Sequence, residues 1–313
     1  MRSVLKNVIG ALVTILVASA VIFAAMQLVP GDPAAEIAGT DATATEVEQV
    51  RQNLGLDRPA WIRYFDWLGG FVTGDFGQSL QHRQSVLTLL KPRLGATLML
   101  DLYATLLVAV VGIGLGVLAA RNRRMSSTLT VVSSVFVGLP TFVAAIFLIQ
   151  VFAISLGWFP ALADTGDGLA STIHSLTLPA IALSLSWIAL VAQISRASFR
   201  EQLGREHVQT AVGRGLTKNA IFRRHVMRNG AAPIVSVISL TMGGLIAGSV
   251  VVERAFSIDG VGAFLVQSIL RHDAEVVMAI TMLIVVVFIA VTVIADLIQL
   301  AIDPRLRSRG VDR

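Results

Sequence analysis

The sequence predicts an all-α integral membrane protein with six transmembrane helices. Of its 313 residues, 55% are hydrophobic and only 14% are charged, whereas soluble domains usually carry about 25% charged residues. Its apolar runs are about 20 residues long, which is the length of helix that crosses a bilayer. Lys and Arg gather at the ends of these runs. The net charge of +5 therefore reflects membrane topology and indicates no nucleic-acid partner.

The first element is a transmembrane helix within residues 1–29, whose apolar run follows Arg2 and Lys6. Basic residues before the run place its N-terminus in the cytoplasm. A cleaved signal peptide is the alternative, with residues 18–20 as the cleavage site. The apolar run continues well past that site and is longer than the apolar region of a signal peptide, which favours a retained helix.

Residues 30–93 form a long polar segment with more acidic than basic side chains, and we assign it to the extracytoplasmic side. Thr45 and Glu48 match a capping box that opens a helix through about residue 54. An aromatic-rich stretch over residues 61–71 should lie at the outer membrane interface. It either packs on the helix bundle, which is the simpler interpretation, or contacts an external binding protein.

Five further apolar runs make up a membrane domain over residues 94–301, and a basic cytoplasmic tail follows over residues 302–313. Pro140 should kink the third helix near its middle, because proline removes a helical hydrogen bond. Pro179 stands at a favourable early position of the fourth helix. The predicted helices after the first cover residues 97–120, 129–155, 178–194, 232–252 and 276–301.

Two pairs of glycines lie about one helical turn apart inside these runs, Gly112 with Gly116 and Gly244 with Gly248. Small residues at this spacing let helices approach closely in lipid. Together with Gly114, the first pair also resembles a dinucleotide-binding fingerprint. The sequence there lacks the strand–turn–helix pattern and the downstream acidic partner of such a site. We therefore expect both pairs to serve helix packing.

A basic loop over residues 197–230 separates the fourth and fifth helices and should face the cytoplasm. Gly213 and Gly215 should end a short helix in this loop, and either Thr217 or Asn219 can cap a second helix starting near residue 220. This arrangement suits docking into a groove of a soluble partner. The alternative is a charge run that only fixes topology, but such a run needs neither a glycine bend nor an apolar stripe. The stripe, at helical spacing, consists of Val208, Ala211, Val212 and Leu216.

Few residues of this chain could carry chemistry, and we expect no catalytic residue and no metal site. The sequence contains no GxxxxGK[ST], no HExxH and no cysteine, so it offers no P-loop and no thiolate ligand. Asp101 and Asp296 lie near predicted helix ends, where water reaches, and we assign them structural roles. Gln150 and Gln193 could line a polar path or bond to a neighbouring helix, and both alternatives stay open.

Several short motifs recur in an order that resembles one family of membrane proteins. HVQTAVGRGL followed by RRHVMRNGAAPIV resembles the EAA loop of ABC-importer permeases. With this loop, the chain resembles the B-type permease of the dipeptide, oligopeptide and nickel importers over nearly its whole length. The resemblance implies the type I ABC-importer permease fold. The further motifs are LVPGDP, LGLDRP, GDFGQS, GLPTF, FSIDGVG and DLIQLAIDPRLR.

The resemblance implies two functional segments. The EAA loop of the family carries a coupling helix that sits in a cleft of the ATP-hydrolysing subunit. Gln209 stands where the motif has glutamate, so the role of that glutamate is not transferred to it. Here the coupling segment consists of Glu206, His207, Val208, Gln209, Thr210, Ala211, Gly213, Gly215 and Leu216. An outer loop dips toward the substrate path near the outer gate, and it consists of Ser257, Ile258, Asp259, Gly260, Val261 and Gly262.

The resemblance also implies the partners and the location of the protein. The expected partners are a homologous second permease, two ATP-binding ABC subunits, an extracytoplasmic substrate-binding protein and the lipid bilayer. This chain needs no cofactor of its own, since ATP and Mg²⁺ would bind to the ATPase subunits. The location would be the bacterial cytoplasmic membrane, with both termini cytoplasmic.

The substrates implied by the resemblance are di- and oligopeptides, and nickel, glutathione or another small solute are the alternatives within the family. A stand-alone carrier or a membrane enzyme is the alternative of another class. An intramembrane enzyme should show paired ionisable groups deep in its helices, and a carrier should show an internal repeat. Neither pattern is clear in the sequence.

Overall fold

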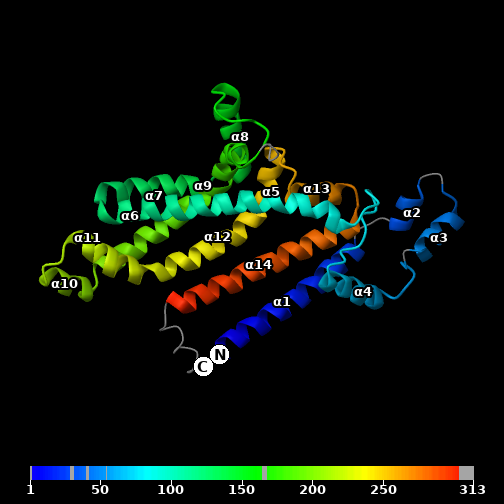
Figure 1. Cartoon of the computed structure of the whole chain (residues 1–313), viewed down its shortest axis with the longest axis horizontal. Helices are drawn as coiled ribbons and strands as arrows, with labels where there is room; N and C mark the ends of the chain where they lie inside the picture. Colours follow the sequence, from blue (N-terminus) through cyan, green and yellow to red (C-terminus); the bar gives the residue numbers. More distant parts are fainter. Residues whose placement is uncertain (1, 29–31, 40–41, 54, 164–167, 303–313) are drawn as a thin grey trace.

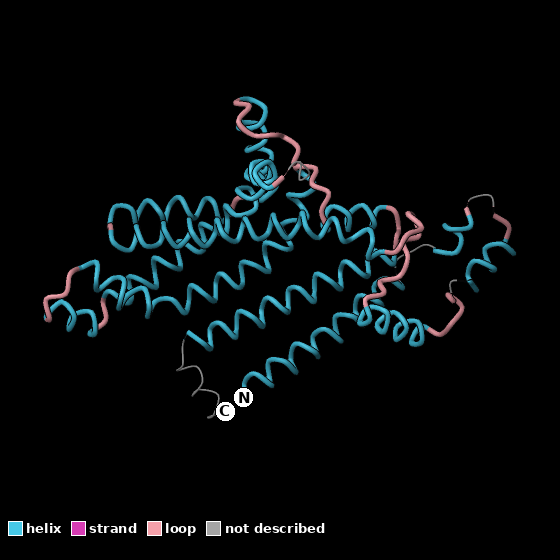
Figure 2. Tube along the Cα trace, in the orientation of Figure 1, coloured by secondary structure: helices cyan, strands magenta, loops and turns pink. Residues whose placement is uncertain are grey.

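Helices make up almost all of the regular structure in the part of the chain that the structure describes. The computed structural model describes residues 2–28, 32–39, 42–53, 55–163 and 168–302. Within these ranges the exception is one isolated β-bridge between Gln78 and Ser85. Figure 2 shows the helices joined by loops. In chain order, with η marking a π-helical stretch, the elements are α1 (Arg2–Gln27), α2 (Pro33–Ala38), α3 (Ala44–Asn53), α4 (Ala60–Thr73), α5 (Val86–Leu107), η1 (Val108–Gly112), α6 (Ile113–Arg121), α7 (Arg123–Val137), α8 (Thr141–Leu148), η2 (Ile149–Ser155), α9 (Leu169–Leu203), α10 (Glu206–Gly213), α11 (Lys218–Ile221), η3 (Phe222–Val226), α12 (Met227–Ala255), α13 (Val261–Leu270) and α14 (Ala274–Ile302).

Five helical segments of the described chain are long and apolar enough to cross a membrane. A sixth span is possible if α7 and the helix formed by α8 and η2 are counted as one broken span. The predicted all-α membrane fold is therefore confirmed. The predicted tail from residue 303 onward lies outside the described residues. The five unbroken spans are Val8–Gln27, Val86–Arg121, Leu169–Leu203, Lys218–Ala255 and Ala274–Ile294.

The third predicted helix, over residues 129–155, is not a single kinked helix. Its two halves are bent by 99° relative to each other, and α8 projects away from the layer formed by α6 and α7 (Figure 1). The break falls at Pro140, which precedes α8 with an extended ψ of 136°. Proline disfavours the helical conformation of the residue before it and donates no hydrogen bond. These two effects end α7 and allow α8 to start in a new direction.

Three of the other helices are longer than their apolar runs. The apolar runs predict helices over residues 97–120, 178–194 and 232–252, because hydrophobicity marks only the part of a helix that lies in the lipid. The helices continue into polar sequence at both ends, and the second of them covers Leu169–Leu203. Pro179 consequently lies inside α9 and not at its start, which corrects the predicted position.

α9 is the central helix of the bundle, and both predicted glycine pairs pack against it. It contacts α5, α6, α7, α8 and α12. A β-carbon built on Gly116 would lie 2.4 Å from Cβ of Ser195, and one built on Gly248 would lie 2.9 Å from Cδ1 of Leu183. At Gly116 the backbone of α9 is also close, at 3.1 Å from the carbonyl oxygen of Ala192, so that only glycine fits there. The predicted packing role of the two pairs is confirmed.

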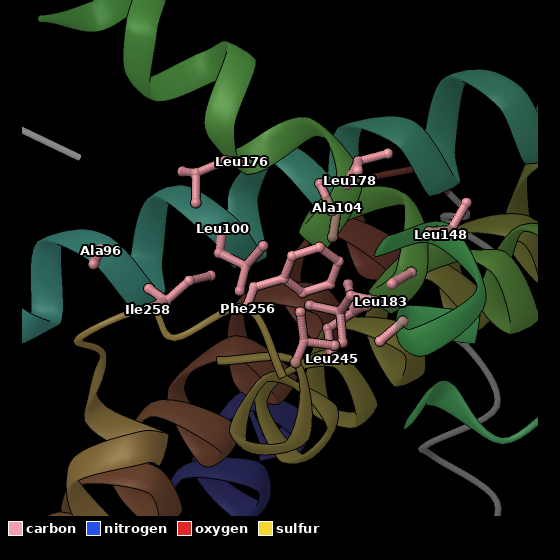
Figure 3. Close-up of a cluster of buried hydrophobic side chains, with 14 residues drawn as sticks. Ala96, Leu100, Ala104, Leu148, Leu176, Leu178, Leu183, Leu245, Phe256 and Ile258 are labelled. Atoms are coloured by element: carbon pink, nitrogen blue, oxygen red, sulfur yellow. The ribbon is translucent and has the colours of Figure 1, made fainter. Parts of the chain in front are cut away.

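One buried cluster joins the N-terminal half of α9 to its neighbours. Leu100 of α5, Leu183 of α9 and Leu245 of α12 meet around Phe256, which follows α12 (Figure 3). Ile258 lies beside Ala96 and Leu100 of α5 in the same cluster (Figure 3). On the other side of α12, α14 packs between α12 and α1, so that these three helices lie side by side (Figure 2).

The segment predicted to be extracytoplasmic begins with the short helices α2 and α3, but its capping box is not where the sequence predicts it. The N–H of Thr43 donates to Oε2 of Glu46 at 2.7 Å, and the N–H of Glu46 faces Oγ1 of Thr43 at 3.4 Å. The capping box is therefore formed by Thr43 and Glu46 and not by Thr45 and Glu48, because α3 starts at Ala44. The backbone and hydroxyl hydrogen bonds from Thr43 lower the pKa of Glu46.

The aromatic stretch of residues 61–71 forms α4, which packs on α1 with one face. The hydroxyl groups of Tyr64 and Ser19 lie 2.8 Å apart, and the ring of Phe23 contacts both Tyr64 and Trp67. Trp61 and Phe65 point outward and are exposed. The packing interpretation therefore holds for the face of α4 with Tyr64 and Trp67, whereas the face with Trp61 and Phe65 is exposed in this chain.

Candidate functional site

The predicted coupling segment forms α10 and the bend after it, at one end of the long axis of the molecule (Figure 1). Val208 and Ala211 are buried in a cluster with Phe199 of α9, Ile221 of α11 and Phe222 of η3. This cluster fixes α10 to the ends of the long helices that lie on either side of it in sequence.

The apolar stripe of α10 divides into two parts. Val208 is 6% exposed, whereas Val212 is 60% exposed and Leu216 is 38% exposed. The stripe therefore does not form one docking face, which corrects the prediction. Val208 and Ala211 hold α10 to its own chain. Val212 and Leu216 stay open beside the exposed predicted residues Glu206, His207, Gln209, Thr210, Gly213 and Gly215.

The bend after α10 has the predicted glycine geometry. Gly213 ends the helix, and Gly215 has a φ of +76°, a left-handed conformation that favours glycine. The N–H of Gly215 donates to the carbonyl of Val212 at 2.9 Å. Thr217 then caps α11, since its Oγ1 accepts from the N–H of Ala220 at 3.3 Å. Of the two predicted caps, Thr217 is the one used.

Arg121, at the end of α6, ties this region to the rest of the bundle. Its guanidinium lies 5.1 Å from the centre of the Phe222 ring and donates a hydrogen bond to the side chain of Asn219. A guanidinium over an aromatic face is a favourable contact. Asn219, the other predicted cap, is thus engaged by a neighbouring helix.

The predicted outer loop, residues 257–262, connects α12 to α13 and includes the first two residues of α13. It is tight, as expected, but the one positive φ within it belongs to Ser257, at +55°, and not to a glycine. Gly260 and Gly262 are needed for space instead. A β-carbon on Gly260 would lie 2.3 Å from Cδ of Glu253, and one on Gly262 would lie 2.7 Å from Cα of Val250.

Glu253 is the residue that the sequence analysis missed. It is 0% exposed, and its Oε1 accepts from the hydroxyl of Thr97 at 2.6 Å. Its Oε2 accepts from the N–H of Ala263 at 2.8 Å. The hydroxyl of Thr97 in turn accepts from the N–H of Val261 at 2.9 Å. A carboxyl group at the end of an apolar run, followed by two closely spaced glycines, was the available signal.

A second connection between α5 and the outer loop lies at the surface. Nε of Arg93 donates to Oδ1 of Asp259 at 2.8 Å, and the guanidinium of Arg93 lies 4.3 Å from the centre of the Phe264 ring. A cavity of about 240 Å³ opens beside it. The cavity is lined by Glu253, Arg254, Ser257, Ile258, Asp259, Ala263, Phe264 and Gln267.

The remaining polar residues singled out from the sequence lie apart from both segments. Asp101 is inside the helical segment Val86–Arg121 and not near its end, and its Oδ1 is buried without a hydrogen-bond partner among the described residues. The helix therefore extends well past the predicted end near Asp101, and access of water to Asp101 stays a prediction. Gln150 is exposed in η2 and Gln193 is half-buried in α9. The side chain of Asp296 lies outside the described residues.

Comparison with known proteins decides the family. Residues 112–308 match the family described as the binding-protein-dependent transport system inner membrane component, and residues 1–101 match the N-terminal region of such membrane components. The chain belongs to this family. The binding-protein-dependent transport permeases of this kind are the membrane subunits of ABC importers, which confirms the resemblance seen in the motifs.

Curated relatives of this permease cover nearly its whole length. The glutathione transport system permease protein GsiC of Shigella flexneri serotype 5b is 35% identical over 97% of this chain and 98% of its own. The protein of the same name from Escherichia coli strain K12 is 34% identical with the same coverage. A solved structure, the inward-facing MetNI methionine ABC transporter, shares the fold with a TM-score of 0.57 at 18% identity, covering 69% of this chain and 97% of its own.

Proposed function

We propose that this permease subunit imports short peptides that an extracytoplasmic binding protein delivers, and that α10 couples it to two ATP-hydrolysing subunits. One observation carries the proposal. A single helical segment, Lys218–Ala255, starts beside the candidate coupling helix and ends at the outer loop. Its 38 residues span about 57 Å at 1.5 Å per residue. A movement of α10 can therefore reach the outer loop through one rigid element.

The proposed mechanism is alternating access. ATP and Mg²⁺ bind to the ATPase subunits, whose closure displaces α10 through contacts on its open side. The open side offers Val212, Leu216 and the exposed polar residues of α10. Because α10 is fixed to η3 through Val208 and Ala211, α12 tilts with it. A homologous second permease supplies the other half of the pathway.

The proposed orientation places α10 and both termini in the cytoplasm. α1 begins and α14 ends toward the end of the molecule that carries α10, whereas α2, α3 and α4 lie at the opposite end (Figure 1). The segment from α10 to η3 is rich in basic residues, which is typical of the cytoplasmic side. This orientation in the bacterial cytoplasmic membrane leaves the exposed aromatic face of α4 available to the binding protein.

Glutathione is the first substrate to test. It is a tripeptide, so it belongs to the proposed class, and the relatives that cover this chain are named for glutathione transport. Dipeptides, longer peptides and nickel are the competing substrates. Competition for uptake by the complex reconstituted with its binding protein would rank them. Uptake of nickel without uptake of any peptide would overturn the substrate proposal and leave the family membership intact.

The coupling proposal is tested by Gly215→Trp. The position has a positive φ, and a β-carbon there would have no atom within 4 Å, so the new side chain projects into the space where a partner would dock. We expect normal membrane insertion, loss of transport, and loss of ATPase subunits in a mild detergent pull-down. Gly157→Trp is the matched control, because Gly157 also has a positive φ and open space but lies after η2. Normal transport by Gly215→Trp would overturn the docking role of α10.

A further inference from the structure

Several hydrogen bonds at the outer loop, residues 257–262, converge on one buried residue, Glu253. Ile258, at the centre of the loop, is 2% exposed and packs against α5 beside Ala96 and Leu100 (Figure 3). The backbone N–H of Ile258 donates to the carbonyl of Glu253 at 2.8 Å. Glu253 therefore contacts both ends of the loop, with its backbone carbonyl at the start and with its side chain at the end.

The side chain of Glu253 closes the other end of the loop. Its two oxygens accept from different elements, the Thr97 hydroxyl on α5 and the Ala263 N–H at the start of α13. The missing side chains of Gly260 and Gly262 leave the space in which this carboxyl group lies. The Glu253 carboxyl group thus fits the space left by the two glycines. Without its two hydrogen-bond donors, burial of this carboxyl group would be strongly unfavourable.

Thr97 makes the arrangement a connection between helices. Its hydroxyl donates to Glu253 and accepts from the N–H of Val261, so it bonds at once to α12 and to the end of the loop. The end of the loop can leave α5 only if the hydrogen bond between Val261 and Thr97 breaks, and Glu253 holds the Thr97 hydroxyl from the other side. The pair of Arg93 and Asp259 is a separate tie, in which the side chain of Arg93 is 18% exposed and that of Asp259 is 74% exposed.

We propose that Glu253 is the positioning residue of the outer loop, and that Glu253 and Thr97 form a latch that holds residues 257–262 against α5. This proposal rests on the proposed function, in which the loop closes the outer end of the peptide pathway. Opening of that end then requires the latch to separate, or α5, α12 and the loop to move as one body. Glu253 acts through the loop and makes no contact with the transported peptide in this role.

The test measures the position of the loop without any substrate. The chain contains no cysteine, so Ile258→Cys introduces one thiol into a naturally cysteine-free permease. The complete importer carrying this change is placed in right-side-out vesicles without binding protein. A membrane-impermeant maleimide is added outside, and the labelling rate of this subunit is followed by its mass shift. The latch should keep the thiol protected.

Thr97→Val removes the hydroxyl at constant shape and should raise the labelling rate by about tenfold or more, since a buried acceptor loses its donor. Thr97→Ser keeps the hydroxyl and should restore protection. Thr105→Val is the matched control on the same helix, because its hydroxyl donates to the carbonyl of Asp101 within that helix. Glu253→Ala should behave as Thr97→Val does.

Labelling of Thr97→Val at the rate of the parent protein would overturn the latch, whether or not Glu253→Ala assembles. An equal rise in Thr97→Ser and Thr105→Val would also overturn it, since that result means general loosening of α5. Peptide uptake is measured separately on the same vesicles. A latch that responds as expected in an importer that takes up no peptide would refute the proposed substrate and leave the latch intact.

Discussion

Trp187 of α9 packs against the backbone of α12 at Gly244, so closely that a β-carbon on Gly244 would lie 2.0 Å from Cζ2 of the indole. Contacts of this kind are shorter than any real Cβ makes, and a large ring wedged between two helices has little room to move. Gly244 is therefore required by the packing of α9 against α12 and not by backbone conformation.

Gly244→Ala should destabilise the protein by about 1–3 kcal/mol, the usual effect of overpacking a tight core. Gly114→Ala is the matched control, because a β-carbon there meets nothing within 4 Å and alanine is the better helix former. The thermal midpoint of the purified protein in detergent, followed by tryptophan fluorescence, should fall for the first variant alone. Equal midpoints for both variants would contradict the close packing.

The two faces of α10 should respond differently to the same change. Val208→Asp places a carboxyl group in the buried cluster with Phe222, which costs several kcal/mol unless the helix detaches. Val212→Asp places it on the open side and should leave folding unchanged. We expect poor yield of folded protein for Val208→Asp, and normal yield with weak ATPase-subunit recovery for Val212→Asp. The reverse result would mean that α10 is rotated.

The hydrogen bonds of Glu46 predict a pH dependence for α3. Thr43 lowers the pKa of Glu46 below its usual 4.5, so the stabilising contact is fully present above that value. It is lost as the pH falls through the lowered pKa. Glu46→Gln should therefore speed hydrogen exchange at the start of α3 near neutral pH. Mutant and parent should converge in acid, when compared at matched pH. A difference that persists at low pH would assign the effect to shape and not to charge.

Much of the fold could be predicted, because hydrophobicity and basic residues act locally. The six apolar runs, the cytoplasmic loop and the glycine bend at Gly215 all follow from neighbours in sequence. Glu253 could not be predicted, since its partner Thr97 lies 156 residues away. The stripe of α10 shows the same limit: spacing identifies one face, but only the packing of Phe222 decides which part of it is covered. Pro140 predicts only a kink, whereas the break and its 99° angle depend on the surrounding helices.

Asp273 should anchor the GDFGQS motif of the extracytoplasmic region to the start of α14. It is buried, and its carboxyl oxygens accept from the Ser79 hydroxyl at 2.5 Å and from the N–H groups of Leu80 and Gln81 at 3.3 and 3.4 Å. Asp273→Ala leaves three donors without their acceptor. Loss of the strongest of these hydrogen bonds, from the Ser79 hydroxyl, should by itself destabilise the junction by about 1–3 kcal/mol.

Limited proteolysis from the outside checks this expectation, because a released segment near residue 80 becomes open to cleavage. Asp273→Asn keeps one carbonyl acceptor and should retain part of the protection, while Ser79→Ala removes only the hydroxyl and should fall between the two. Asp66→Ala is the control, since Asp66 pairs with Arg58 at the exposed surface of the same region and such pairs contribute little. Cleavage of Asp273→Ala at the parent rate would show that Phe76 and its hydrophobic neighbours hold the segment without Asp273.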